Sequence, residues 1–131
     1  MRFLLDTNII SAFLKGDGRV FNQFIQHSGG LCTSVVCAGE LYSWVYRAKT
    51  GPARLQALQD VLSDLFLLPV DQALAQRFGQ VRAALLDHGH PTPGMDLLIA
   101  CTALEHDLTL VTANVRDFAH IPNLRLENWL A

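Results

Sequence analysis

Four separated stretches of the sequence carry carboxylate or amide side chains beside apolar runs. The residues concerned are Asp6, Glu40, Asp96 and the pair Asn114 and Asp117. Carboxylates that fold to one place raise one another's pKa and repel unless a cation neutralises them. Mg²⁺ and Mn²⁺ prefer oxygen ligands, and a metal held this way can orient a phosphate and activate water. The chemistry that this pattern favours is phosphodiester hydrolysis.

Each of these residues also has an ordinary structural explanation. Asp6 can cap the helix that follows it, and Glu40 can be a solvent-facing helical residue. Asp96 can favour a helix N-terminus through the helix dipole, and Asn114 or Asp117 can cap the next turn. Taken jointly the ordinary explanations weaken, because the apolar neighbours of Asp6 and Asp96 imply partial burial, which makes clustered charges costly.

The elements that must position these residues are indicated by apolar runs alternating with amphipathic segments. Strands are expected at residues 3–6, 31–36, 66–70 and 108–112, with a weaker one at 124–128. Helices are expected at residues 7–16, 19–28, 36–49, 52–65, 71–89 and 93–107. Because the strands are apolar throughout rather than alternating, the pattern predicts an α/β fold with a parallel sheet of four to five strands and helices on both faces. Ligands of such sheets bind beyond the carboxyl ends of the strands, where the acidic residues lie.

Length and composition narrow the class of protein. The chain has 131 residues, of which half are hydrophobic and 17% charged, so we expect one folded domain over 1–131 rather than a disordered chain. The apolar start is too short for a signal peptide, and later stretches are interrupted by charge or proline before they reach membrane-spanning length. We therefore expect a cytoplasmic protein without membrane contact.

The basic residues, cysteines and histidines do not indicate a second binding or metal site. The net charge is −2 and the ten basic residues are scattered, so a polyanionic substrate would need a local basic face or metal ions. The three cysteines lack the paired spacing of a disulfide framework or a zinc site and are expected to be core thiols: Cys32, Cys37 and Cys101. His88 and His90 lie in a Pro/Gly-rich turn without a third ligand, which favours an exposed pair.

Four motifs in order carry a resemblance to a known family. They are LLDTNIIS, SVVCAGELY, GMDLLIACTAL, and LVTANVRDF followed by LENW, and they span Phe3 to Trp129. Together they resemble the PIN domain, especially the VapC-type toxins of bacterial toxin–antitoxin pairs. The resemblance implies a Mg²⁺- or Mn²⁺-dependent endoribonuclease, the toxin of a type II system, that cuts tRNA or other structured RNA with metal-activated water. It also implies a small antitoxin partner and a homodimer.

The same resemblance assigns roles to individual residues. Asp6 and Asp96 match the two metal-binding aspartates, and Glu40 matches the helical acid that assists them. Asn114 matches a fourth catalytic position where many relatives carry Asp, so this sequence lacks one charge there. Asp117 can contribute to the metal site without binding the metal directly. We expect Thr7, Asn8 and Thr112 to fix the ligands by hydrogen bonds.

Surfaces for RNA and protein are less distinct in the sequence. The basic residues that can contact RNA phosphates are Lys15, Arg47, Lys49, Arg82 and Arg116. Tyr42, Trp44 and Tyr46 alternate along one helix, so not all three can face inward, and some exposed aromatic surface is expected for an antitoxin or dimer contact.

A different class of function is compatible with the same motifs. A catalytically inactive PIN-like module would bind RNA or protein without cutting, and it predicts RNA retention without cleavage in Mg²⁺ or Mn²⁺. An aspartyl-nucleophile phosphatase would want a second Asp two residues after Asp6, but Asn8 occupies that position.

Overall fold

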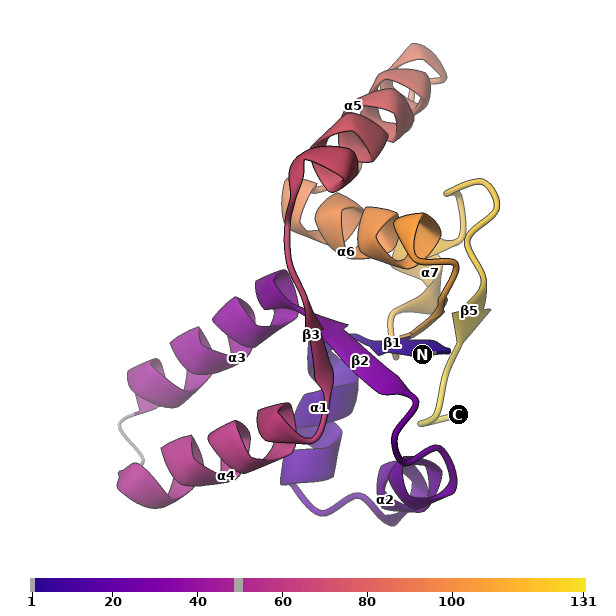
Figure 1. Ribbon diagram of the computed structural model, residues 1–131. Helices are drawn as coiled ribbons and strands as arrows, with labels where there is room; N and C mark the ends of the chain where they lie inside the picture. Colours follow the sequence, from indigo (N-terminus) through magenta and orange to yellow (C-terminus); the bar gives the residue numbers. More distant parts are fainter. Residues whose placement is uncertain (1, 49–50) are drawn as a thin grey trace.

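The sheet at the centre of the molecule is built from five short parallel strands. The structure, a computed structural model, describes residues 2–48 and 51–131 (Figure 1). The strands are β1 (Phe3–Leu5), β2 (Leu31–Ser34), β3 (Phe66–Leu68), β4 (Thr109–Val111) and β5 (Leu126–Glu127). Their order is β3-β2-β1-β4-β5, and every pairing is parallel. The predicted α/β class and parallel sheet are confirmed.

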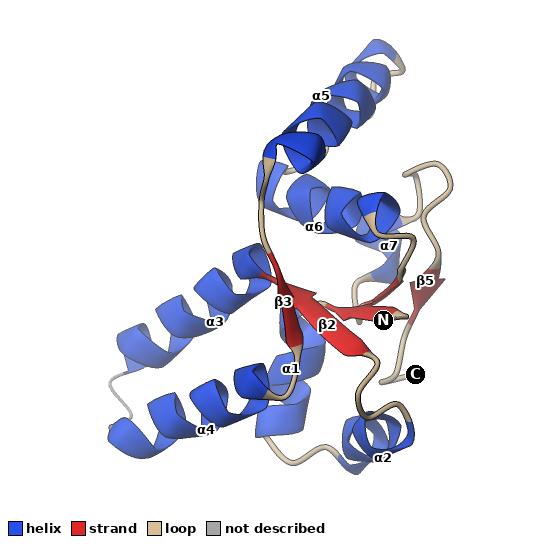
Figure 2. Ribbon diagram, in the orientation of Figure 1, coloured by secondary structure: helices blue, strands red, loops and turns tan. Residues whose placement is uncertain are grey.

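Helices lie on both sides of this sheet (Figure 2). They are α1 (Thr7–Leu14), α2 (Gly18–Gln26), α3 (Val35–Ala48), α4 (Pro52–Ser63), α5 (Gln72–Asp87), α6 (Gly94–Glu105) and the short α7 (Val115–Phe118). Local chemistry sets several of their starts. Asp17 and Asp71 accept backbone N–H groups as N-caps of α2 and α5, and Pro52 occupies the first turn of α4, where its missing N–H costs nothing.

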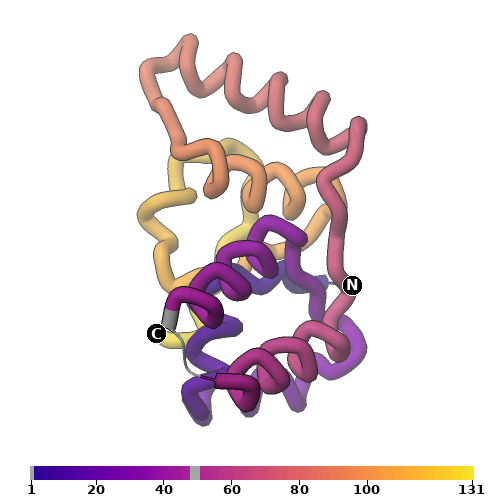
Figure 3. The backbone as a smooth tube through the Cα atoms, turned by 90° about the vertical axis from the view of Figure 1, so that its left-hand side faces the viewer, coloured from indigo at the N-terminus to yellow at the C-terminus, as the bar shows by residue number. Residues whose placement is uncertain are grey.

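Two hydrophobic cores form because successive strand residues point to opposite faces of the sheet. Leu4 and Leu110 pack on one face with residues of α5 and α6, whereas Phe3 and Leu5 pack on the other with residues of α1 to α4. Helices α3 and α4 run side by side away from the sheet (Figure 1 and Figure 3). None of the helices within the described ranges is long and apolar enough to cross a membrane.

Strand β3 departs from the expectation that every strand is covered on both faces. Phe66 is 53% exposed and Leu67 is 46% exposed, while Leu68 is buried. The reason is position, since β3 lies at the edge of the sheet and pairs only with β2. An apolar run alone cannot distinguish such an edge strand from a central one.

The strand order also creates a switch point. From β1 the chain moves outward to β2 and β3 and then returns to add β4 on the other side of β1. The crevice at the carboxyl ends of two strands that diverge in this way is where open parallel sheets bind ligands. Asp6 directly follows β1 and Thr112 directly follows β4.

Candidate active site

Asp6 serves as a helix cap and as a wall of a cavity. The backbone N–H of Thr7 donates to its Oδ1 at 2.8 Å, which makes Asp6 the N-cap of α1. Its Oδ2 accepts from Thr112 Oγ1 at 2.8 Å and from Asn8 Nδ2 at 3.4 Å. The residue is only 5% exposed. The capping and functional explanations of Asp6 are therefore compatible, because its Oδ1 caps the helix while the same side chain lines a cavity.

Glu40 reaches the same place from α3. Thr7 Oγ1 donates to Glu40 Oε1 at 2.8 Å, so the residue after Asp6 holds the second carboxylate. One turn before Glu40, the Sγ of Cys37 lies 3.9 Å from Asp6 Oδ1. In the part of the chain that the structure describes, ligand atoms of Asp6, Cys37 and Glu40 lie within 4.8 Å of one another. The carboxylates of Asp6 and Glu40 are thus close enough to share a metal ion.

An open cavity of about 380 Å³ joins this group to Asp96 and Asn114. Its walls are Asp6, Thr7, Asn8, Ser11, Glu40, Leu41, Trp44, Asp96 and Asn114. Asp96 occupies the first turn of α6 and lies outside the compact group of three. Asn114 precedes α7 and makes no side-chain capping bond to it, so the ordinary capping explanation does not apply to this residue.

Burial and mutual repulsion disfavour the charged forms of the two aspartates. Burial raises the pKa of Asp6 above its ordinary value, and the charge of Glu40 adds to this, while hydrogen bonds from Thr112, Thr7 and Asn8 oppose it. Partial burial also raises the pKa of Asp96, followed by the charges of Asp6 and Asp117. A cation would offset these costs. The donor set of carboxylates and an amide oxygen fits a hard divalent cation.

The profile of the PIN domain matches residues 3–124 of the sequence. The chain belongs to the PIN domain family. It is 30% identical to Ribonuclease VapC2 of Haemophilus influenzae over 99% of each chain, and 32% identical to the tRNA(fMet)-specific endonuclease VapC of Shigella flexneri over 98% of each.

Solved structures of PIN proteins have the same fold. VapBC2 from Rickettsia felis bound to a promoter DNA fragment superposes with a TM-score of 0.91 at 30% identity, covering 98% of this chain and 99% of that one. DNA-bound VapBC from Salmonella typhimurium superposes with a TM-score of 0.84 at 32% identity and 98% coverage of both chains. The resemblance seen in the motifs is confirmed.

In this PIN domain the structure brings together most of the residues expected at the site. The carboxylates of Asp6, Glu40 and Asp96 line one cavity with the amide of Asn114, as do Thr7 and Asn8. Thr112 is buried beneath Asp6. Asp117 lies outside the cavity, exposed at the surface near Asn114, and acts on the site through its charge.

The basic residues proposed as RNA contacts are spread over several surfaces. Lys15 and Arg47 are exposed, at the end of α1 and in the last turn of α3, and Arg116 is exposed two residues beyond Asn114. Arg82 lines a separate cavity beside His90 and Thr92, so the fold does not bring it to the acidic one. Lys49 lies outside the described residues.

Two residues of the site were missed by reasoning from the sequence. Cys37 was expected only as a core thiol; it is buried, but it also contacts Asp6, and burial with the nearby Asp6 charge raises its pKa to about 12, so the thiol stays neutral. Trp44 was expected as core or as a protein contact, yet it lines the acidic cavity. The signal was present, because Cys37 and Trp44 lie three before and four after Glu40 on one helix face.

Other expectations concern groups outside the acidic cavity. Tyr46 is 64% exposed and its ring stacks on that of Tyr42, so the aromatic set on α3 does not all face inward. His88 and His90 are exposed as predicted. A larger cavity of about 580 Å³ between α5 and the C-terminal loop is lined partly by these histidines and His120, and it contains no carboxylate.

Replacing Thr112 with Val is expected to destabilise the protein. Thr112 Oγ1 donates to Asp6 and accepts from the backbone N–H of Asn114 at 3.0 Å, and the side chain is fully buried. Val keeps the shape but removes two hydrogen bonds. Asp6 Oδ2 keeps only the longer bond from Asn8, and the N–H of Asn114 loses its acceptor, which costs about 1–3 kcal/mol in free energy of unfolding. Urea denaturation measures the loss. Thr112→Ser is the matched control, and a valine variant as stable as the serine one would contradict the role of the hydroxyl.

Proposed function

We propose that this PIN domain is a metal-dependent endoribonuclease and the toxin of a type II toxin–antitoxin pair, cutting tRNA or other structured RNA. The observation that carries the proposal is the meeting of Asp6, Glu40 and Asp96 in one open cavity at the carboxyl edge of the sheet. Its relatives, a ribonuclease and a tRNA(fMet)-specific endonuclease, support the same chemistry. Because the substrate is cellular RNA, we infer action in the cytoplasm.

In this proposal Asp6 and Asp96 hold Mg²⁺ or Mn²⁺. Glu40 completes the site by direct coordination or by accepting a hydrogen bond from the attacking water, and Asn114 orients a ligand or water. When bound, the cation supplies orientation of the phosphate oxygens and a lowered pKa for water. The neighbours position these groups, since Thr7 donates to Glu40 and Asn8 Oδ1 accepts from the backbone N–H of Ala113 at 3.0 Å.

Incubation of purified protein with total RNA tests this function. We expect discrete fragments in Mn²⁺ or Mg²⁺ and intact RNA with a chelator. RNA that is retained by the protein but not cut in either metal would instead support the catalytically inactive binding module. The feature that favours this alternative is Asn114, which lacks the charge of an aspartate at the fourth site position. Fragments that persist at full rate in chelator would contradict the metal requirement.

A small antitoxin is the protein partner that we propose. The similar structures from Rickettsia felis and Salmonella typhimurium, which are VapBC complexes, support this pairing. Co-expression of this chain with the product of an adjacent small reading frame, followed by copurification, tests the pairing. Failure of the two chains to copurify would argue against that product as the antitoxin.

The exposed edge of the sheet supports a homodimer. Phe66, Leu67 and Val70 place three apolar side chains, each 45% exposed or more, on β3 and the loop after it. We expect the Phe66→Ser, Leu67→Ser double variant to weaken self-association by about tenfold or more, because buried apolar area would be lost. Analytical ultracentrifugation measures the dissociation constant. Ile25→Ser on α2 is the control, and equal effects of both changes would contradict this interface.

A further inference from the structure

None of the described residues that line the acidic cavity carries a positive charge. Its nine lining residues include three carboxylates and no lysine or arginine. An RNA strand is a polyanion, and a metal ion neutralises charge only at the phosphate that is cut. The rest of the strand needs cations near the rim of the cavity.

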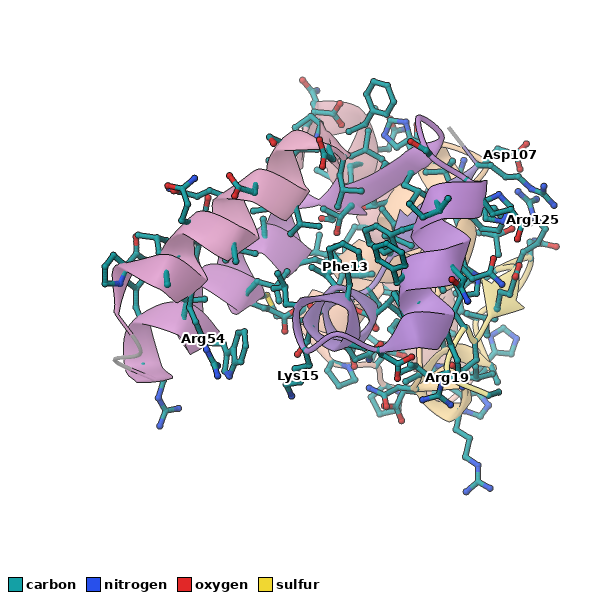
Figure 4. All side chains as sticks on the ribbon, turned by 90° about the horizontal axis from the view of Figure 1, so that it is seen from below. Phe13, Lys15, Arg19, Arg54, Asp107 and Arg125 are labelled. Carbon is teal, nitrogen blue, oxygen red and sulfur yellow. The ribbon has the colours of Figure 1, made fainter. Side chains whose placement is uncertain are left out.

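Trp44 lies at that rim with two cations against its ring. It is one turn beyond Glu40 on α3 and is half-buried, with part of its surface open to solvent. The Cζ of Arg54 lies 5.2 Å from the ring centroid and the Nζ of Lys15 lies 5.8 Å from it. Arg54 comes from α4 and Lys15 from the end of α1, so three elements meet at this ring. Figure 4 shows both cations on the same side of the molecule.

Neither of these cations belongs to an ion pair within the described ranges. The ion pairs there join Arg19 to Asp17, Arg77 to Glu105 and Arg125 to Asp107. Lys15 and Arg54 are exposed and carried on long flexible side chains. No carboxylate in the described part of the chain holds either cationic group in place, so a phosphate can compete with the ring for it.

We propose that Trp44, Lys15 and Arg54 form a platform that binds an unpaired nucleotide of the RNA beside the bond that is cut. The base stacks on the indole, and the two cations contact the flanking phosphates. Aromatic rings next to basic side chains bind single strands in this way, because every base has a π-face. The charge of the group favours a nucleic acid over an apolar protein segment. The proposal rests on the proposed ribonuclease function and adds the residues that hold the RNA strand next to the cleavage site.

Binding of a labelled single-stranded oligoribonucleotide tests the platform. The measurement uses full-length protein carrying Asp96→Asn, so that the RNA stays intact, in Mg²⁺ and with fluorescence anisotropy as the readout. We expect Trp44→Leu to weaken binding about tenfold and Trp44→Phe to restore most of it, since one stacked base contributes an effect of this size. Lys15→Gln and Arg54→Gln should each weaken binding about threefold and reduce its salt dependence.

Tyr46→Leu is the matched control, because its exposed ring lies on the same helix but does not line the cavity. It should bind RNA like the parent. In the active protein Trp44→Leu should raise KM more than it lowers kcat. Unchanged RNA affinity in Trp44→Leu would overturn the proposal and assign the ring to a protein partner. If Trp44→Leu fails to fold, Lys15→Gln and Arg54→Gln provide the test, and unchanged RNA affinity in both would overturn the proposal.

The outcomes separate this proposal from the proposed function. Cleavage in Mn²⁺ that does not depend on Trp44 would overturn the platform alone. Binding of RNA that depends on Trp44, in a wild-type protein that never cuts, would overturn the ribonuclease function and leave the platform standing.

Discussion

Asp96→Asn and Asp6→Asn are each expected to lower the rate of metal-dependent RNA cleavage by about 10³-fold or more. Both residues line the acidic cavity, and each supplies a carboxylate that an amide cannot replace in charge. Loss of a ligand that neutralises a divalent cation removes several kcal/mol of transition-state stabilisation, and each 1.36 kcal/mol corresponds to a factor of about ten in rate. Initial rates on an RNA substrate in saturating Mg²⁺ measure the effect.

The matched control is Asp117→Asn. It removes the same charge from an exposed residue that lies outside the acidic cavity. We expect its effect on the rate to stay within about tenfold, because Asp117 is exposed and reaches the site only through its charge, and exposed charge pairs contribute about 1 kcal/mol or less. Circular dichroism checks that both cavity variants remain folded. Rates that fall equally in all three variants would show that overall negative charge, and not the cavity, is what the reaction requires.

The stability of the folded protein is also expected to depend strongly on bound metal and on pH. Burial raises the pKa of Asp6 above its ordinary value of 3.8, and the pKa of Asp96 is raised too. The folded metal-free protein therefore binds protons more tightly than the unfolded chain. Stability from these groups is fully present below about pH 3.8 and is lost as pH rises through their raised folded pKa values.

A bound divalent cation reverses this dependence, because it favours the ionised carboxylates. At neutral pH, metal at about a hundred times its dissociation constant adds about 2.7 kcal/mol, which corresponds to an increase in Tm of about 5–10 °C. Scanning calorimetry with Mg²⁺ or with chelator, at several pH values, measures both effects. The gain from metal should grow from acid to neutral pH.

Asp6→Asn separates this effect from the titration of other groups. Without metal, the wild-type protein should lose stability relative to the variant as pH rises from about 3.8, since the variant has no carboxyl group at this buried position. Metal should raise the Tm of the wild type and leave that of the variant nearly unchanged. Equal stabilisation of both proteins by metal would place the ion elsewhere in the chain.

The order of strands and helices along the chain, except for the short α7, and the edge of the sheet that carries the chemistry were predictable from the sequence. Apolar runs and amphipathic segments are local features, and parallel strands all end at one edge of a sheet. Asp6 and Asn114 follow strands, and Glu40 lies in the helix after β2, so these three had to lie near that edge. Asp96 begins α6, which follows another helix, so its place at the edge was decided by how α5 and α6 pack. The structure places all four at one cavity.

The tertiary structure decided which side chains actually touch. Phe66 and Leu67 of β3 are exposed because β3 has one neighbour in the sheet, a property that its composition does not encode. Trp44 meets Arg54 and Lys15 only because α1, α3 and α4 converge beside the cavity. Arg82, equally basic, lies beside a different cavity. Periodicity determines the face of a helix that a residue occupies, but contacts between distant segments depend on how the elements pack, and only the folded chain contains that information.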